Sequence, residues 1–284
     1  MADRSTSLRE HCLAILESEG LEPKLAPPFG PDGGLLPDTD PGHSLFVARP
    51  ARSAELAMRA GAARLPRPGE LDSPRARATC LRRFAHHELM AVELFAWALL
   101  RWPEQASELR RELALALADE QRHCRLYLER LAAHGERLGD EPLSDYFWKH
   151  VPAIHAHPRG PLAFLAAMGL TLEQANLDFT LLYADGFRRA GDEESACVSE
   201  LVHRDEQRHV ALAAKWLARL APGEGEVEAY TASVPFPLEA SRAKGRGFDA
   251  AARRRAGLGE AFIAHVRDAR ATQESRPRSR RAES

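Results

Sequence analysis

The chain has 284 residues, of which 44% are hydrophobic and 28% are charged, and its formal net charge is −2. This balance excludes a general electrostatic attraction to nucleic acid, and the length favours one decorated domain. We find no signal-peptide pattern, no apolar run suited to span a membrane, and no Cys-x-x-Cys pair among the four cysteines. We therefore expect a cytoplasmic protein with free thiols.

The first 75 residues are expected to form a short helix followed by an irregular wrap. Residues 8–19 have an amphipathic pattern, whereas residues 22–75 contain many Pro and Gly residues, which interrupt helices. We assign residues 1–75 to an N-terminal decoration of the main domain.

Residues 80–100 are apolar on nearly all sides, which is typical of a helix buried on most of its surface. This helix contains Glu88 and Glu93, whose directions differ by about 140° because five residues separate them. Glu88 is the predicted metal ligand, since apolar residues surround it on its face. Glu93 shares a face with His86, and we expect these two to contact each other beside the ligands. A buried ion pair with Arg or His is favoured over ligation for Glu93.

The sequence Asp-Glu-Gln-Arg-His occurs twice, at residues 119–123 and 205–209. Each copy places a Glu and a His three residues apart, so that both side chains lie on one helical face and can reach one metal ion. These residues are Glu120 with His123 and Glu206 with His209. Both glutamates lie in mainly apolar stripes, where an unpaired carboxylate would be costly to bury. The alternative is a solvated surface patch with local ion pairs.

A further apolar helix is expected at residues 161–184, and it contains Glu173 and, five residues later, Asp178. Glu88 and Glu173 precede the motif glutamates by 32 and 33 residues, which indicates an internal duplication. The duplication predicts Glu173 as another carboxylate ligand and places two metal ions near a pseudo-two-fold axis. An ion pair is favoured over ligation for Asp178.

The connections between these helices predict the fold class. Tight links are expected near residues 102–103 and 191–192, whereas residues 135–160 form one long link. A single long crossover between two hairpins is typical of ferritin-like folds. The sequence therefore predicts an all-α, ferritin-like four-helix bundle over residues 76–221.

The C-terminal part is expected to decorate this bundle. Residues 222–269 are predicted to pack on it, with an irregular segment at 222–248 and a helix at 249–269. Residues 253–255 are three arginines, for which a solvated helix face is the expected place. The Arg-rich tail, residues 270–284, has no periodicity and is predicted to be disordered.

Five segments in this order resemble the ferritin-like family catalogued as domain of unknown function 455. They are DSPRARATCLRRFAHHELMAVEL, DEQRHCRLYLERL, LEQANLD, RDEQRHVALAAKW and PFPLEASRAKGRGF. The resemblance covers roughly residues 40–250 and implies a ferritin-like bundle with a di-metal site whose reaction is not established. The ligands that it implies are Glu88, Glu120, His123, Glu173, Glu206 and His209. The Asp-Glu-x-Arg-His form also resembles O2-activating di-iron oxygenases and tRNA-hydroxylating enzymes more than storage ferritins.

These ligands predict two iron ions, with manganese as the alternative, because imidazole and carboxylate suit both metals. Glu120 and Glu206 are expected to bridge the ions. Asp119 and Asp205 can accept the free N–H of a ligand histidine and so fix its tautomer. The full set of residues expected around the ligands is Asp119, Asp205, Arg122, Arg208, Glu93, Asp178, His86 and His203.

Three functions fit this pattern. The first is an O2-dependent oxidase or oxygenase, such as a hydroxylase, which needs an electron donor and a small-molecule or RNA substrate. The second is a ferroxidase or iron-handling protein, and the third is a non-catalytic bundle that metal ions stabilise. The Asp/Arg pairs and the long irregular segments, which can cover a pocket, favour the first. Tyr127, one turn after His123, is expected in the core or at the border of that pocket.

Overall fold

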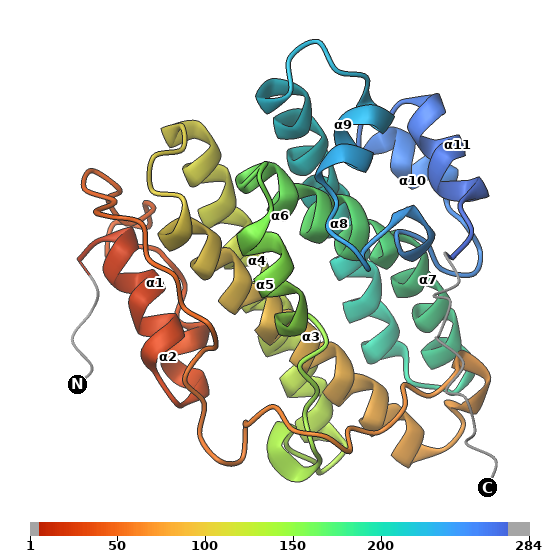
Figure 1. Cartoon of the computed structure of the whole chain (residues 1–284). Coiled ribbons are helices and arrows are strands. Elements are labelled where there is room, and N and C mark those ends of the chain that lie inside the picture. The colour runs from red at the N-terminus through yellow and green to blue at the C-terminus, as the bar shows by residue number, and fades with distance from the viewer. Residues whose placement is uncertain (1–5, 272–284) are drawn as a thin grey trace, which may run out of the picture.

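The chain is all-helical over the part that the computed structural model describes, residues 6–271, apart from two isolated β-bridges (Figure 1). Its central elements are α3 (Pro74–Arg101), α4 (Ser107–Ala133), α6 (Pro161–Ala167), the π-helix η4 (Met168–Glu173), α7 (Gln174–Arg189) and α8 (Glu193–Leu220). The all-α prediction is confirmed, whereas the ferritin-like arrangement stays a prediction.

The central helices pack in two pairs. α3 lies along α4, and α7 lies along α8, while α4 and α6 also contact α8. Short links at residues 102–106 and 190–192 join the members of each pair, so each pair is antiparallel. In both pairs the expected tight connection is present.

The apolar core consists of two clusters that meet at a band of polar residues. Along α3, the first cluster includes Leu81 to Leu89 and the second includes Met90 to Leu100. α4 divides in the same way, since Leu117 belongs to one cluster and Cys124 to the other. The predicted ligands lie in this band, with apolar packing on both sides.

The long link between α4 and α6 contains short helices. They are η2 (Leu138–Asp140), η3 (Trp148–His150) and α5 (Val151–Ala156). The N-terminal helices α1 (Leu8–Glu17) and α2 (Leu21–Leu25) pack on α3 and α4, and η1 (Pro68–Glu70) packs on α7. In Figure 1 α1 and α2 lie on the opposite side of the molecule from α9, α10 and α11.

The C-terminal segment is more helical than expected. It contains α9 (Glu226–Ser233), η5 (Ala240–Arg242), α10 (Ala250–Arg255) and α11 (Glu260–Asp268). The segment 222–248 is therefore not wholly irregular. The single helix predicted at 249–269 is wrong, because Gly257 adopts a φ of 81° after α10, a left-handed conformation that suits glycine and ends a helix.

Further predictions concern the Arg-rich tail, membrane-spanning segments and the cysteines. Residues 272–284, most of the Arg-rich tail, lie outside the described residues. Between residues 6 and 271, no helix is both long and apolar enough to cross a membrane. All four cysteines are free thiols, and Cys197 is the exposed one.

Candidate metal centre

Glu173 is the last residue of a π-helix, although the sequence predicts one uninterrupted α-helix over residues 161–184. A Cβ on Gly169 would lie 2.3 Å from the Cβ of Ala213, so α8 approaches the backbone of η4 directly. The Thr171 hydroxyl donates to the carbonyl of Ala166, five residues earlier, at 2.7 Å. Single-turn π-helices occur often at functional sites, where the extra residue changes the direction of a side chain.

All six predicted ligands meet in the polar band. Their exposed fractions are at most 6%. They form two groups whose candidate ligand atoms lie within 4.8 Å of one another: Glu88, Glu120 and His123; and Glu120, Glu173, Glu206 and His209. Glu120 belongs to both groups, so its carboxylate lies between two candidate metal positions.

Several ligand atoms in this cluster have no hydrogen-bond partner. They are Nδ1 of His123 and of His209, both carboxylate oxygens of Glu120, and one oxygen each of Glu173 and Glu206. His209 Nδ1 lies 3.0 Å from Glu120 Oε1, but this approach lacks hydrogen-bond geometry. Buried polar atoms without partners are costly, and coordination would remove the cost. Two divalent cations would also neutralise the four carboxylates, so the donor set fits two such ions.

The two motifs orient each other's histidine. Asp205 Oδ2 lies 3.0 Å from His123 Nε2, and Asp119 Oδ2 lies 3.4 Å from His209 Nε2. Each aspartate of one Asp-Glu-Gln-Arg-His copy therefore contacts the histidine of the other copy. A proton on Nε2 that points to aspartate leaves the Nδ1 lone pair directed at the glutamates, which is the tautomer that coordination requires.

Arg122 and Arg208 join the two aspartates into one cluster. Arg122 pairs with Asp119 at 2.8 Å and also with Asp205. Arg208 pairs with Asp119 at 2.9 Å and with Asp205 at 2.6 Å. Burial would raise the pKa of Asp205, but His123, with Arg208 and Arg122, outweighs burial and holds this pKa at about 2. Asp205 is therefore a carboxylate over the ordinary pH range.

We expect Asp119→Ala and Asp205→Ala to fold and to bind metal about 10- to 100-fold more weakly, as is usual when a partner of a ligand is removed. Each change frees one histidine ring to rotate away from the glutamates. Titration with Mn²⁺ measures the effect, and the exposed Asp185, changed to Ala, is the matched control. Unchanged affinity in both variants would contradict the orienting role.

A family model described as "Protein of unknown function (DUF455)" matches residues 31–264. The chain belongs to this family. The comparisons with curated proteins and with solved structures gave no match. The DUF455 match includes all six predicted ligands and both copies of the repeated motif, and its description assigns no reaction.

Three residues expected around the ligands of this DUF455 protein make their polar contacts elsewhere. Glu93 and His86 both contact Arg52, at 2.7 Å and 2.8 Å, so Arg52 joins them, and Glu93 forms the ion pair that was favoured for it. Asp178 forms the ion pair that was favoured for it, with Arg253 at 2.8 Å. Arg253 is 0% exposed, so its placement on a solvated face is wrong.

His203, the fourth such residue, reaches the centre through a chain of hydrogen bonds. Its Nδ1 lies 3.1 Å from the Thr180 hydroxyl, which donates to the carbonyl of Asn176. The Asn176 amide donates to Glu206 Oε1 at 2.8 Å. Asn176 is not among the residues predicted around the ligands, although it follows Glu173 by three residues and so shares its face. The bond from Asn176 occupies one oxygen of Glu206, whereas both oxygens of Glu120 are without partners. Glu120 is therefore better placed than Glu206 to bridge two metal ions.

The side chains of the cluster hold additional protons when no cation is bound. These protons offset the negative charge of the four neighbouring carboxylates. Burial raises the pKa of Glu88 and of Glu173 well above the usual range, and neighbouring carboxylates add to this. Burial opposes the charge on His123, but Asp205 and Glu120 outweigh it and raise the pKa to about 9. The pKa of His209 is raised well above its usual value because Asp119, Glu120 and Glu206 likewise outweigh burial. Burial also raises the pKa of Glu206, so the buried cluster favours protons on the histidines and on these carboxyls.

We expect metal affinity to rise with pH up to about 9, because each cation must displace these protons and His123 holds its proton below that pKa. One proton released per ion gives a rise of about tenfold per pH unit, and release of several gives a steeper rise. Competition between the protein and a chelator for Mn²⁺ at several pH values measures the slope. A flat profile between pH 6 and pH 9 would contradict this protonation state.

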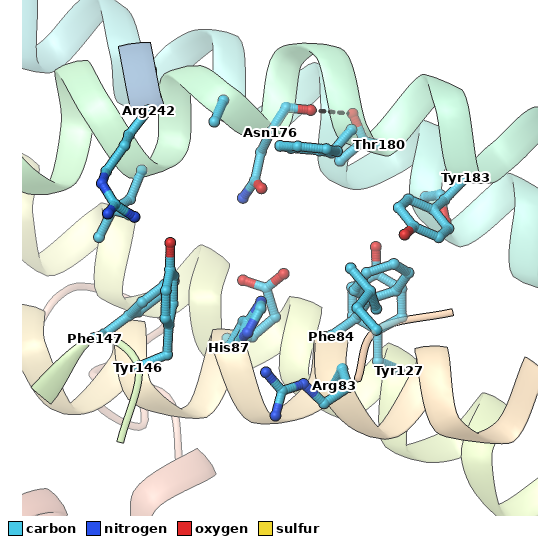
Figure 2. A pocket seen from close by; sticks show the side chains of 16 residues that line it. Arg83, Phe84, His87, Tyr127, Tyr146, Phe147, Asn176, Thr180, Tyr183 and Arg242 are labelled. Carbon is cyan, nitrogen blue, oxygen red and sulfur yellow. Dashed lines mark hydrogen bonds between the residues drawn. The ribbon is translucent and has the colours of Figure 1, made fainter. Parts of the chain in front are cut away.

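A cavity of about 280 Å³ reaches the centre from one side. It includes Glu88, one of the candidate ligands, and Asn176, which contacts Glu206. Figure 2 shows aromatic side chains at both ends of this space, with His87 between them. Tyr127 lines the cavity and is buried, so both expected positions, core and pocket border, apply to it.

Proposed function

We propose that this DUF455 protein is a ferritin-like di-metal protein that oxidises an organic substrate with O2, using two iron ions or, alternatively, manganese. The observation that supports this best is a buried set of unpartnered ligand atoms beside a cavity that shares Glu88 with it. Reduced iron at such a centre would supply O2 activation, while the protein selects the substrate. For hydroxylation, one oxygen atom enters a C–H bond and the other leaves as water, with two electrons from an external donor and two protons.

The residues of the chain have separate tasks in this proposal. Glu88 with His123, and Glu173 with His209, would hold one ion each, and Glu120 would bridge them. Glu206 would complete the second position or form a second bridge. Glu88 faces both the centre and the cavity, so a substrate in the cavity lies beside the reacting position. The apolar clusters on both sides of the band keep water away.

The lining of the cavity favours substrate oxidation over iron handling. An entry path for Fe²⁺ needs acidic or neutral polar side chains, whereas Arg83 and Arg242 line this space and would repel cations. Glu88 is the one carboxylate in the lining. A cavity bordered by aromatic rings instead suits an organic molecule.

Anaerobic iron loading followed by exposure to O2 tests the proposal. We expect two irons per chain by elemental analysis, a small assembly by light scattering, and O2 uptake that requires an electron donor. A cage-sized particle that accumulates iron well beyond two per chain would identify an iron store. Full metal content without any reaction with O2 would indicate a non-catalytic bundle.

A further inference from the structure

Resting on the proposed function, we infer that the substrate of this centre is a small organic acid with an apolar body. Its carboxylate would pair with Arg83, Arg242 at the mouth would attract the anion, and its body would fill the aromatic cavity beside Glu88.

Arg83 is a partly buried cation without an ion-pair partner among residues 6–271. Its Nε is buried and makes no hydrogen bond. Burial lowers the pKa of Arg83, and the acidic group that opposes this is the phenol of Tyr146. Its neighbour Arg82, in contrast, pairs with Glu136 and Glu141. A desolvated, uncompensated guanidinium beside a cavity favours an anionic ligand, and its planar fork matches a carboxylate.

Arg242 marks the mouth of the cavity. It is the exposed residue among the sixteen that line the space, and it too has no ion-pair partner in the described part of the chain. Figure 2 shows it beside Tyr146 and Phe147, at the opposite end from Tyr127 and Tyr183, which are buried. An acid that enters here would pass Arg242 first, whereas Arg83 lines another side of the space, on α3.

The deeper part of the cavity suits an apolar body. Phe84 contacts Tyr127 and Tyr183, with ring centroids 5.4 Å and 5.0 Å away. Nearer the mouth, Phe147 stacks on His87 at 5.2 Å. The volume of about 280 Å³ is nearly twice that of a cavity of about 150 Å³ that holds benzene. This space is enough for about two fused rings or a chain of similar volume. His87 Nε2 is buried and unpartnered, and it offers one further polar contact.

Calorimetric titration of the metal-loaded protein with 2-naphthoate and with its neutral analogue 2-naphthamide tests the inference. We expect the acid to bind at least about 10-fold more tightly than the amide, because a hydrogen bond to a charged group is worth more than one to a neutral group. Arg83→Gln should remove most of this preference, and Arg242→Gln should reduce it. The matched control is Arg246→Gln, an exposed arginine outside the lining, which should leave the preference unchanged.

The results separate this inference from the proposed function. Equal affinity for acid and amide, no binding of either at millimolar concentration, or an unchanged preference in Arg83→Gln would overturn the inference. The last result would indicate that the acid coordinates the metal instead, and metal analysis of each variant verifies that the centre is intact. Binding through Arg83 in a protein that consumes no O2 would refute the oxidase and leave the acid site standing.

Discussion

Replacing Glu120 by alanine is expected to remove most of the bound metal. Glu120 is the residue that both candidate metal groups share, and both of its oxygens are buried without partners. Its loss deprives both ions of a ligand and leaves two protonated histidines facing each other in a dry site. We expect an affinity loss beyond the roughly 100-fold upper range for residues that only contact a ligand. Elemental analysis after dialysis measures the remaining metal.

The controls for Glu120→Ala lie on the same helix. Glu129→Ala changes an exposed glutamate of α4 and should retain full metal content. Glu120→Gln keeps the volume of the side chain and verifies that metal loss does not result from unfolding, which circular dichroism would reveal. Full metal content in Glu120→Ala would refute the assignment of the centre.

Glu206→Ala is expected to lose metal as well, but less completely. One oxygen of Glu206 accepts the amide of Asn176, and Glu206 belongs to only one of the two groups. The two motifs are identical and so predict that their glutamates are equivalent bridges. Their surroundings differ, since the residue 85 positions before Asn176 is Ala91, which has no amide to donate.

The clustering of the candidate ligands could be predicted because it depends on local periodicity. A Glu and a His three residues apart share a helix face whatever the rest of the chain does, and the repeat identified all four motif residues. The π-helix that ends at Glu173 includes Gly169, which lies directly against α8. The sequences of α6 and α7 give no local sign of this contact. The break after α10 has a visible signal in the sequence, because Gly257 is a residue type that commonly ends a helix.

The sequence predicts ion pairs for the acids that follow Glu88 and Glu173, but it does not identify their partners. Glu93 and Asp178 lie 85 residues apart, each five residues after a predicted ligand, and a buried ion pair was expected for both. Their partners, Arg52 and Arg253, come from the N-terminal and C-terminal segments. Arg253 is followed by two exposed arginines, Arg254 and Arg255, so the sequence around it resembles a solvated face. Only the tertiary contact distinguishes it from its neighbours.

These ion pairs tie the two outer segments to the central helices. Glu93 accepts from Arg52 at 2.7 Å and 3.0 Å, from Trp148 at 2.9 Å, and lies 3.1 Å from Lys24 Nζ. Asp178 accepts from both terminal nitrogens of Arg253, at 2.8 Å and 2.9 Å. Further bonds to Asp178 come from the backbone N–H groups of residues 245 and 249. In each half of the duplication, one acid faces the centre and the next holds an outer segment.

Glu93→Ala and Asp178→Ala are each expected to lower the free energy of unfolding by about 3–5 kcal/mol, because removal of one partner leaves a buried cation without compensation. Urea denaturation measures this loss. The double variant Asp178→Leu with Arg253→Met should be far less destabilised than Asp178→Ala alone, since it removes both charges and fills the space. Metal content per folded chain should stay at the parent value, because neither acid contacts a ligand in the described structure. Metal loss without any loss of stability would show instead that these acids belong to the centre itself.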